Sequence, residues 1–299
     1  MTYSIVARDP LTGRFGVAVQ SHYLGVGPVV PWLAPGVGAI ATQARVDISF
    51  GPIGLELLRN GRTAEQVVAA LLASDATPEV RQVGVVDMEG RAAAHTGAET
   101  IPAAGHLVGD GFTVQGNLLE RDTCWPAMAR AYEAALAEEL PFSERLLRAL
   151  EAAEAEGGDV RGRQSSAIVI VEGTLQSNAW KGRVLDARVD DHPDPVPELR
   201  RIVNLYEAYA LFDPDQAGEQ GESYDEAAAY AEARRRAPEA IELAFWMGIE
   251  HAKRGEITEA RRELAIAFAA DTRWRTTLEH LADAEREGMN RELADQLLD

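Results

Sequence analysis

The chain has 299 residues, of which 46% are hydrophobic, and its 48 acidic and 29 basic residues give a formal net charge of −19. This length suits one large domain or two ordinary ones, and so acidic a surface disfavours nucleic acid and membrane lipid as partners. A single cysteine, Cys124, the lack of a signal-peptide pattern and the lack of an apolar run long enough to span a bilayer predict a cytoplasmic protein without an intrachain disulfide.

The first 210 or so residues alternate strand-like and helix-like patterns. We expect strands over residues 3–8, 16–20, 38–43, 82–87, 91–96, 112–117, 165–171 and 183–189. We expect helices over residues 53–59, 63–73 with Thr63 as N-cap, 125–137, 143–156 and 195–211. This order is typical of antiparallel sheets with helices packed outside them.

The last third of the chain has a different, helical pattern. Residues 213–222 are polar and contain glycine, which predicts a linker between a first domain at 1–212 and a helical segment at 223–299. The segment has the spacing of a 34-residue helix-turn-helix repeat at Gly248, Gly255, Ala260, Leu264 and Ala267. It resembles a tetratricopeptide repeat with one complete unit. Two roles stay open: a short surface that binds a protein partner, or a lid on exposed core.

Thr2 directly precedes the first strand-like run. If Met1 is removed, Thr2 carries both a hydroxyl and a free α-amine, and the amine can take the hydroxyl proton as the oxygen attacks a carbonyl. An α-amine has a pKa of about 8, so a useful fraction is neutral at pH 7. The alternative is that Thr2 is an ordinary β-branched residue that opens an edge strand.

Five phrases of the chain, residues 2–9, 36–44, 114–117, 161–165 and 188–195, resemble the uncharacterised DUF1028 family. The start of the chain also resembles the Ntn-hydrolase (N-terminal nucleophile) superfamily, in which a Thr, Ser or Cys opens a strand, a hairpin follows and a third strand enters a helix. The resemblance implies an α+β protein whose first domain is a four-layer αββα sandwich, here followed by the small all-α segment. The resemblance does not indicate a substrate.

The resemblance also implies a set of catalytic residues. Thr2 occupies the nucleophile position, and Ser21 lies at the end of the second strand, where such enzymes place a polar group near the nucleophile. Gln43 and Ala44 lie where the third strand enters the helical region, and Asn117 resembles the asparagine of small Ntn amidases. These three residues are expected to hold the oxyanion.

A second set of residues is expected to bind the substrate: Arg8, His95, Arg163 and Gln164. Arg163 and Gln164 begin a strand and could hold the α-amine or a substrate carboxylate. Arg8 could supply positive charge without shuttling a proton. For His95, as for His106, packing or surface polarity is the alternative.

Two observations limit the chemistry. Residues 27–32, where proteasome-like enzymes carry a lysine, contain none, so small-amide chemistry or an inactive site fits better than proteolysis. Residues 190–194 form a polar knot that could bind a divalent ion, or whose Asp194 could cap the helix that begins at Pro195. Since the sequence has no glycine-rich phosphate loop, Rossmann fingerprint or His-x-x-x-His pair, we expect neither a cofactor nor a resident metal.

These patterns predict an Ntn-type amidohydrolase that cleaves a small amide or peptide-like substrate, with Thr2 as nucleophile after Met1 removal. The alternative is a catalytically inactive module on the same fold that binds a ligand or a partner. A homodimer of the αββα domain and a protein partner bound through the C-terminal helices are further expectations.

Overall fold

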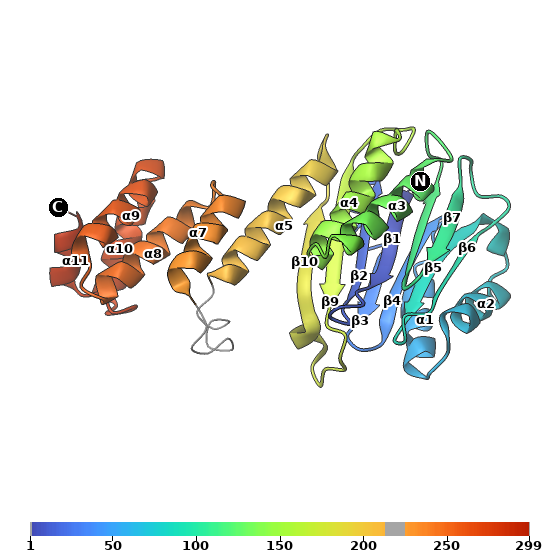
Figure 1. The fold of residues 1–299 in the computed structure, drawn as a ribbon, viewed down its shortest axis with the longest axis horizontal. Helices are drawn as coiled ribbons and strands as arrows, with labels where there is room; N and C mark the ends of the chain where they lie inside the picture. Colours follow the sequence, from blue (N-terminus) through green and yellow to red (C-terminus); the bar gives the residue numbers. More distant parts are fainter. Residues whose placement is uncertain (1, 213–224, 299) are drawn as a thin grey trace. The chain divides into compact units, whose positions relative to one another are not determined.

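The structure is a computed structural model that describes residues 2–212 and 225–298. The chain divides into two compact units, Met1–Ile202 and Val203–Asp299. The first is a mixed α+β unit with two antiparallel sheets, and the second consists of helices, orange to red in Figure 1. The linker predicted at 213–222 lies outside the described residues.

Sheet A has six strands in the order β10-β9-β2-β1-β8-β7. In that order the strands are Arg183–Val189, Ser165–Val171, Phe15–Ser21, Thr2–Arg8, Phe112–Asn117 and Gly105–Gly109. The predicted hairpin of β1 and β2 is confirmed, and its turn is fixed by Asp9, whose carboxylate accepts hydrogen bonds from Leu11 N and Thr12 Oγ1. Because β1 pairs with β2 on one side and β8 on the other, Thr2 opens a central strand.

Sheet B has four strands in the order β3-β4-β5-β6, at Pro31–Ala34, Gly38–Ala44, Arg81–Asp87 and Ala92–Thr96. The predicted hairpin of β5 and β6 is confirmed. Strands β3 and β7 were not predicted. Both end a sheet, and β3 opens with Pro31, a position at which the missing N–H of proline costs no ladder hydrogen bond.

The two sheets pack face to face through an apolar core. One buried cluster combines Val6, Val17 and Val19 of sheet A with Ala39 and Val86 of sheet B. Because side chains alternate along a strand, the other residues of the same parity also point between the sheets. Toward the start of β1 these residues become polar, and the candidate site lies there.

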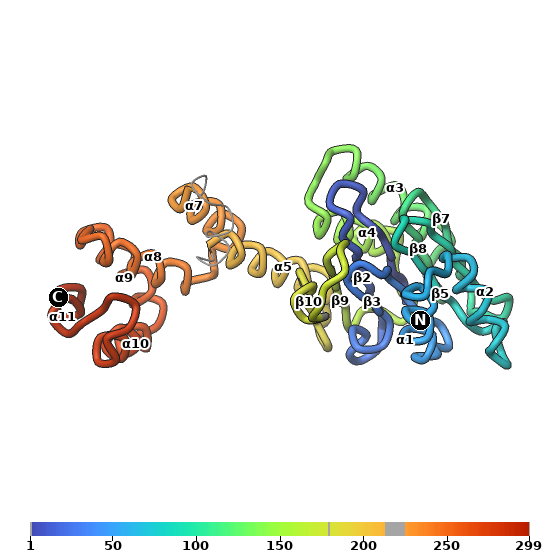
Figure 2. Tube along the Cα trace, turned by 90° about the horizontal axis from the view of Figure 1, so that it is seen from below, coloured from blue at the N-terminus to red at the C-terminus, as the bar shows by residue number. Residues whose placement is uncertain are grey.

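Helices cover the outer face of each sheet. Helices α1 (Phe50–Arg59) and α2 (Ala64–Ser74) pack on sheet B, where Phe50 and Leu71 join one buried cluster with Ile40. Helices α3 (Cys124–Ala137) and α4 (Phe142–Ala155) pack on sheet A. Figure 2 shows α3 and α1 on opposite sides of the strands. Thr63 caps α2 as predicted, because its Oγ1 accepts a hydrogen bond from Gln66 N.

Short 3-10 helices lie at Pro78–Val80 and Ala179–Gly182, and α5 spans Pro195–Leu211. The remaining helices are α7 (Glu226–Arg236), α8 (Ile241–Lys253), α9 (Ile257–Ala270), α10 (Arg273–Asp283) and α11 (Arg291–Leu298). Helices α8 and α9 approach closely at Gly248, where an added Cβ would lie 2.7 Å from Leu264 Cγ. Each helix of residues 2–212 and 225–298 is too short or too polar to cross a membrane.

Candidate functional site

Thr2 and Ser21 form the centre of the candidate site. Thr2 Oγ1 lies 3.0 Å from Ser21 Oγ, across the pair of β1 and β2. Their exposed fractions are only 5% and 1%. Thr2 shares the inner face of β1 with Val6, so its hydroxyl is directed between the two sheets.

Two side-chain amides hold the main chain of Thr2. Gln43 Nε2 and Asn117 Nδ2 each donate to the carbonyl oxygen of Thr2 at 3.3 Å. The same two nitrogens donate to Gln82 Oε1, at 2.7 and 2.8 Å. A primary amide has two N–H groups, so both donors of Gln43 and of Asn117 are engaged. In this arrangement the two amides fix the backbone of Thr2, and neither has a donor left for an oxyanion.

Gln82, at the start of β5, connects these amides to the main chain. Its Nε2 has three acceptors within hydrogen-bonding distance, Gly116 O at 2.8 Å, Thr96 Oγ1 at 2.9 Å and Gly105 O at 3.1 Å, which its two N–H groups share. A main-chain carbonyl only accepts, so Nε2 must face the glycines and Oε1 must face Gln43 and Asn117. Gln82 is fully buried. It was not among the predicted site residues, and its position on the inner face of β5 was the one available signal.

The polar network continues between the sheets beyond Gln43. Ser4 Oγ donates to Gln43 Oε1 at 2.6 Å and accepts from Gln115 Nε2 at 2.7 Å. Thr113 Oγ1 donates to Gln115 Oε1 at 2.8 Å. Gly84 faces this network from sheet B, and an added Cβ there would lie 2.4 Å from Thr113 Oγ1. The network is therefore satisfied by its own members, and Gly84 leaves the space that it needs.

A cavity of about 70 Å³ lies beside Thr2. Its lining residues are Thr2, Ser21, Tyr23, Val26, Val29, Val30, Gln43, Ala44 and Val46. Four of the five predicted catalytic residues thus line one cavity. The fifth, Asn117, does not line it but donates a hydrogen bond to the carbonyl oxygen of Thr2. Ala44 has a φ of 68°, in the left-handed region, which is uncommon for a residue with a side chain. Such backbone is found preferentially at functional sites.

The wall between β2 and β3 is fixed by hydrogen bonds. Ser165 Oγ accepts from Val26 N at 3.1 Å and donates to Tyr23 O. The Asp159 carboxylate, also missed in the sequence, accepts from His22 N at 3.0 Å and is paired with Arg161 at 2.9 Å. The segment that follows Ser21 is therefore held at both its start and its middle.

The structure places Arg8 and His95 away from this cavity. Arg8 ends the seven-residue strand that Thr2 begins, so at about 3.3 Å per residue the two lie roughly 20 Å apart. His95 Nε2 lies 3.1 Å from Pro78 O. Neither residue is among those that line the cavity.

Arg163 and Gln164 are engaged with the polar knot instead. Arg163 pairs with Glu154 and, at 2.6 Å, with Asp194. Gln164 Nε2 donates to Asp191 Oδ1 at 3.2 Å. Within residues 2–212 and 225–298 no group of three or more His, Cys, Asp or Glu side chains is arranged to hold a metal ion. The contacts of the knot thus tie the start of β9 to the segment before α5.

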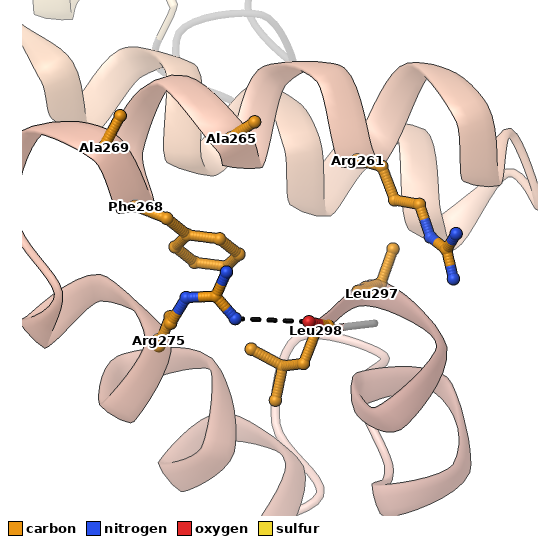
Figure 3. Close-up of a pocket in the computed structure, with 7 residues that line it drawn as sticks. All are labelled: Arg261, Ala265, Phe268, Ala269, Arg275, Leu297 and Leu298. Atoms are coloured by element: carbon orange, nitrogen blue, oxygen red, sulfur yellow. Dashed lines mark hydrogen bonds between the residues drawn. The ribbon is translucent and has the colours of Figure 1, made fainter.

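A larger hollow, of about 420 Å³, lies in the C-terminal unit. Figure 3 shows its lining residues, Arg261, Ala265, Phe268, Ala269, Arg275, Leu297 and Leu298. The Arg275 guanidinium lies 4.7 Å from the centre of the Phe268 ring and donates to Leu298 O at 3.2 Å. Arg261 Nε donates to Gln296 O at 2.7 Å. These arginines satisfy carbonyls at the end of α11, and the lining residues include no nucleophile, so the cavity at Thr2 is the stronger candidate.

Comparisons with known proteins agree with the resemblance to the DUF1028 family seen in the sequence. A family described as "Family of unknown function (DUF1028)" matches residues 2–199, which include every residue that lines the Thr2 cavity. The crystal structure of protein SPO2555 from Silicibacter pomeroyi, of the same family, is similar with a TM-score of 0.62 and 30% sequence identity, over 73% of this chain and 92% of that chain. A search among curated proteins found no match. The chain therefore belongs to the DUF1028 family, whose function is unknown.

Proposed function

We propose that the chain is an amidohydrolase of the N-terminal nucleophile type that acts on a small amide or peptide-like substrate. The observation that carries this proposal is the Thr2 hydroxyl, which lies 3.0 Å from Ser21 Oγ at the start of a central strand and lines a cavity. A hydroxyl and an α-amine on one residue supply both nucleophile and base once Met1 is removed. The cytoplasmic location expected from the sequence belongs to this proposal.

The reaction would proceed in two steps. In the first, Thr2 Oγ1 bonds to the carbonyl carbon while its proton passes to the α-amine; the C–N bond then breaks, and the leaving amine takes that proton. In the second, water attacks the resulting ester, which releases a carboxylic acid and restores the Thr2 hydroxyl. The Ser21 hydroxyl, 3.0 Å away, orients Oγ1 for attack.

The main-chain N–H of Ala44 is our candidate for the oxyanion donor, because the amides of Gln43 and Asn117 are occupied. Thr42 N donates to Val30 O at 3.2 Å on the β3 side of β4, and Arg45 N donates to Val80 O at 3.3 Å on the β5 side. Since amides alternate along a strand, the Ala44 N–H faces the β3 side, beyond the end of β3 and toward the cavity that Ala44 lines. A fixed backbone donor of this kind stabilises developing negative charge.

The order of the packed elements supports the assignment of the fold. Helices α1 and α2, sheet B, sheet A, and helices α3 and α4 follow one another as helix, sheet, sheet and helix layers. This is the layer order of the αββα sandwich that the resemblance to Ntn hydrolases implies. We include the Ntn-like sandwich in the proposal.

The first test is the intact mass of the protein purified without an N-terminal tag. We expect a chain that lacks Met1 and that gains one covalent adduct on Thr2 from a β-lactone, an electrophile that acylates hydroxyl nucleophiles. The Thr2→Ser variant keeps a hydroxyl and should react, whereas Thr2→Ala should not. A wild-type protein that retains Met1, or that reacts as Thr2→Ala does, would contradict the mechanism.

A binding module on the same fold is the second candidate. It is favoured by the lack of a lysine among the described residues that line the cavity, and by the engagement of both amides that flank Thr2. The helices from α7 onward, which resemble a tetratricopeptide unit, would then recruit a protein partner. Ligand-induced stabilisation of residues 1–211 alone would assign recognition to the first unit, whereas binding only by the full chain would favour the module. Sedimentation of the full chain would test the expected homodimer.

A further inference from the structure

We infer that the cavity beside Thr2 selects substrates by a small, uncharged, aliphatic acyl group. This inference rests on the proposed function of Thr2 and adds the chemical class of the group that is transferred. It follows from the residues of the cavity wall, from the volume of the cavity and from the side at which a product must leave.

Four of the nine residues that line the cavity are valines. Val26 and Val30 are 1% and 2% exposed and belong to the apolar cluster between the sheets, and Val29 packs against that cluster. Val46 adds a fourth valine. Among the described side chains that line the cavity none is charged, and the α-amine of Thr2 belongs at the reacting carbonyl. A carboxylate or an ammonium group at the far end of an acyl chain would therefore lose its water without gaining an ion-pair partner in the wall, which disfavours such charged acyl groups.

The volume limits the size of the group. An engineered apolar cavity of about 150 Å³ binds benzene, which has six carbon atoms. By that scale the Thr2 cavity, at about 70 Å³, holds roughly three carbon atoms. Propionyl and butyryl groups, whose alkyl chains have two and three carbon atoms, match this space, and a hexanoyl group, with an alkyl chain of five, exceeds it.

The acyl group of the substrate, and not its amine, should occupy the cavity. After the first step the acyl group remains bonded to Thr2, which is 5% exposed, while the amine must depart to water. The rim of the cavity offers that exit, since Tyr23 and Val46 are 53% and 36% exposed. The cavity therefore constrains the acyl side and leaves the amine side open.

A series of p-nitrophenyl esters tests this inference. With each ester the bond from Thr2 Oγ1 to the acyl carbon forms while the Oγ1 proton passes to the α-amine. The bond from that carbon to the aryl oxygen breaks, and p-nitrophenolate leaves with the electron pair. Intact-mass kinetics should show propionyl and butyryl esters acylating Thr2 at least about tenfold faster than the hexanoyl ester or the negatively charged succinyl monoester. Equal rates across the series, or a preference for succinyl, would overturn the inference and leave the nucleophile in place.

Cavity variants sharpen the test. Val30→Ala shortens a side chain of the wall and so enlarges the cavity, which should shift the acyl preference toward the hexanoyl ester. Val17→Ala is the matched control, because Val17 lies in the same buried cluster but does not line the cavity. Its acyl preference should equal that of the wild type. A shift in both variants would show that the preference does not come from the wall.

Binding to the Thr2→Ala variant separates this inference from the proposed function. Saturation-transfer NMR should detect propionamide and isobutyramide but not succinamate, and Val30→Ala should weaken the signal of propionamide. If these amides bind while no ester acylates wild-type Thr2, the ligand preference holds and the hydrolase mechanism fails. If no ester reacts and no amide binds, both are overturned.

Discussion

The hydroxyl oxygens of Thr2 and Ser21 lie 3.0 Å apart because the hairpin of β1 and β2 sets the two residues opposite each other. The register pairs Tyr3 with Gln20 and Arg8 with Phe15, so it is fixed by the turn at Asp9. That turn lies at the other end of the strands. The placement of the two hydroxyls at the start of β1 and the end of β2 thus depends on a tight turn roughly 20 Å away.

Replacing Ser21 with alanine removes the hydroxyl that we propose orients the Thr2 nucleophile. A net hydrogen bond contributes about 0.5–1.5 kcal/mol, so we expect Ser21→Ala to acylate Thr2 roughly two- to tenfold more slowly with an intact fold. Ser166→Ala is the matched control, since Ser166 Oγ donates to Pro195 O on the outer face of sheet A. Intact-mass kinetics measure both. An unchanged rate in Ser21→Ala would remove Ser21 from the mechanism.

Gln82→Met leaves two buried amide donors, on Gln43 and Asn117, without their acceptor. At about 1–3 kcal/mol for each unsatisfied buried group, we expect the free energy of unfolding to fall by about 3 kcal/mol or more. Urea denaturation followed by circular dichroism measures this loss. Gln176→Met, at an exposed glutamine, should stay within about 0.5 kcal/mol of the wild type. Equal stability of the two variants would mean that the hydrogen bonds from Gln43 and Asn117 to Gln82 do not stabilise the packing of the two sheets.

Arg145 and Asp9 form a fully buried ion pair at 2.8 Å, each with a side chain that is 1% exposed. Removing one partner leaves the other charge buried without a counter-charge, so Arg145→Met should lower the free energy of unfolding by about 3–5 kcal/mol. The pair of Arg14 and Glu172 is the surface counterpart, with side chains 38% and 31% exposed, and Arg14→Met should cost less than about 1 kcal/mol. If the double variant Arg145→Met with Asp9→Asn loses as much as the two single losses added together, the coupling is refuted.

Asp9 should also make stability depend on pH. Burial alone would raise the pKa of Asp9, but hydrogen bonds from Thr12, Arg145 and Leu11 lower it below its ordinary value. A carboxyl whose folded pKa is depressed stabilises the protein above the unfolded pKa of about 4, and this contribution is lost as the pH falls below that value. Urea unfolding of the wild type and of Asp9→Asn should therefore differ most near neutral pH and converge in acid. A gap that widens in acid would show the opposite sign.

Much of the fold follows from local sequence patterns. The strands at 112–117, 165–171 and 183–189 and the helix at 195–211 match the prediction residue for residue. Each has a strong apolar or helical pattern, and a Gly or Pro lies at or near at least one of its ends. Strand β3 was not predicted because Pro31 within it and Pro35 after it are typical of a loop, and β7 was not predicted because Gly105 and Gly109 are. Both are edge strands, and an edge strand is defined by the neighbour to which it pairs more than by its own residues.

The candidate site was predictable in part. The resemblance placed Thr2, Ser21, Gln43 and Ala44 in one set, and all four line one cavity. Gln82 could not be found in the same way, since its partners come from segments that lie up to 39 residues away in the sequence. The engagement of both Gln43 donors is equally a product of tertiary packing. Local sequence indicates which residues are polar and buried, but not which acceptor each donor will reach.

The fixed direction of the amides also has an evolutionary consequence. Gln82 is oriented by main-chain carbonyls, which no side-chain substitution can turn into donors, and its orientation in turn dictates those of Gln43 and Asn117. A carboxylate at position 43 or 117 would place its oxygen, which only accepts, against Gln82 Oε1, which also only accepts. The three amides should therefore be inherited as one unit among relatives that keep Thr2, and should drift together in lineages where Thr2 has been lost.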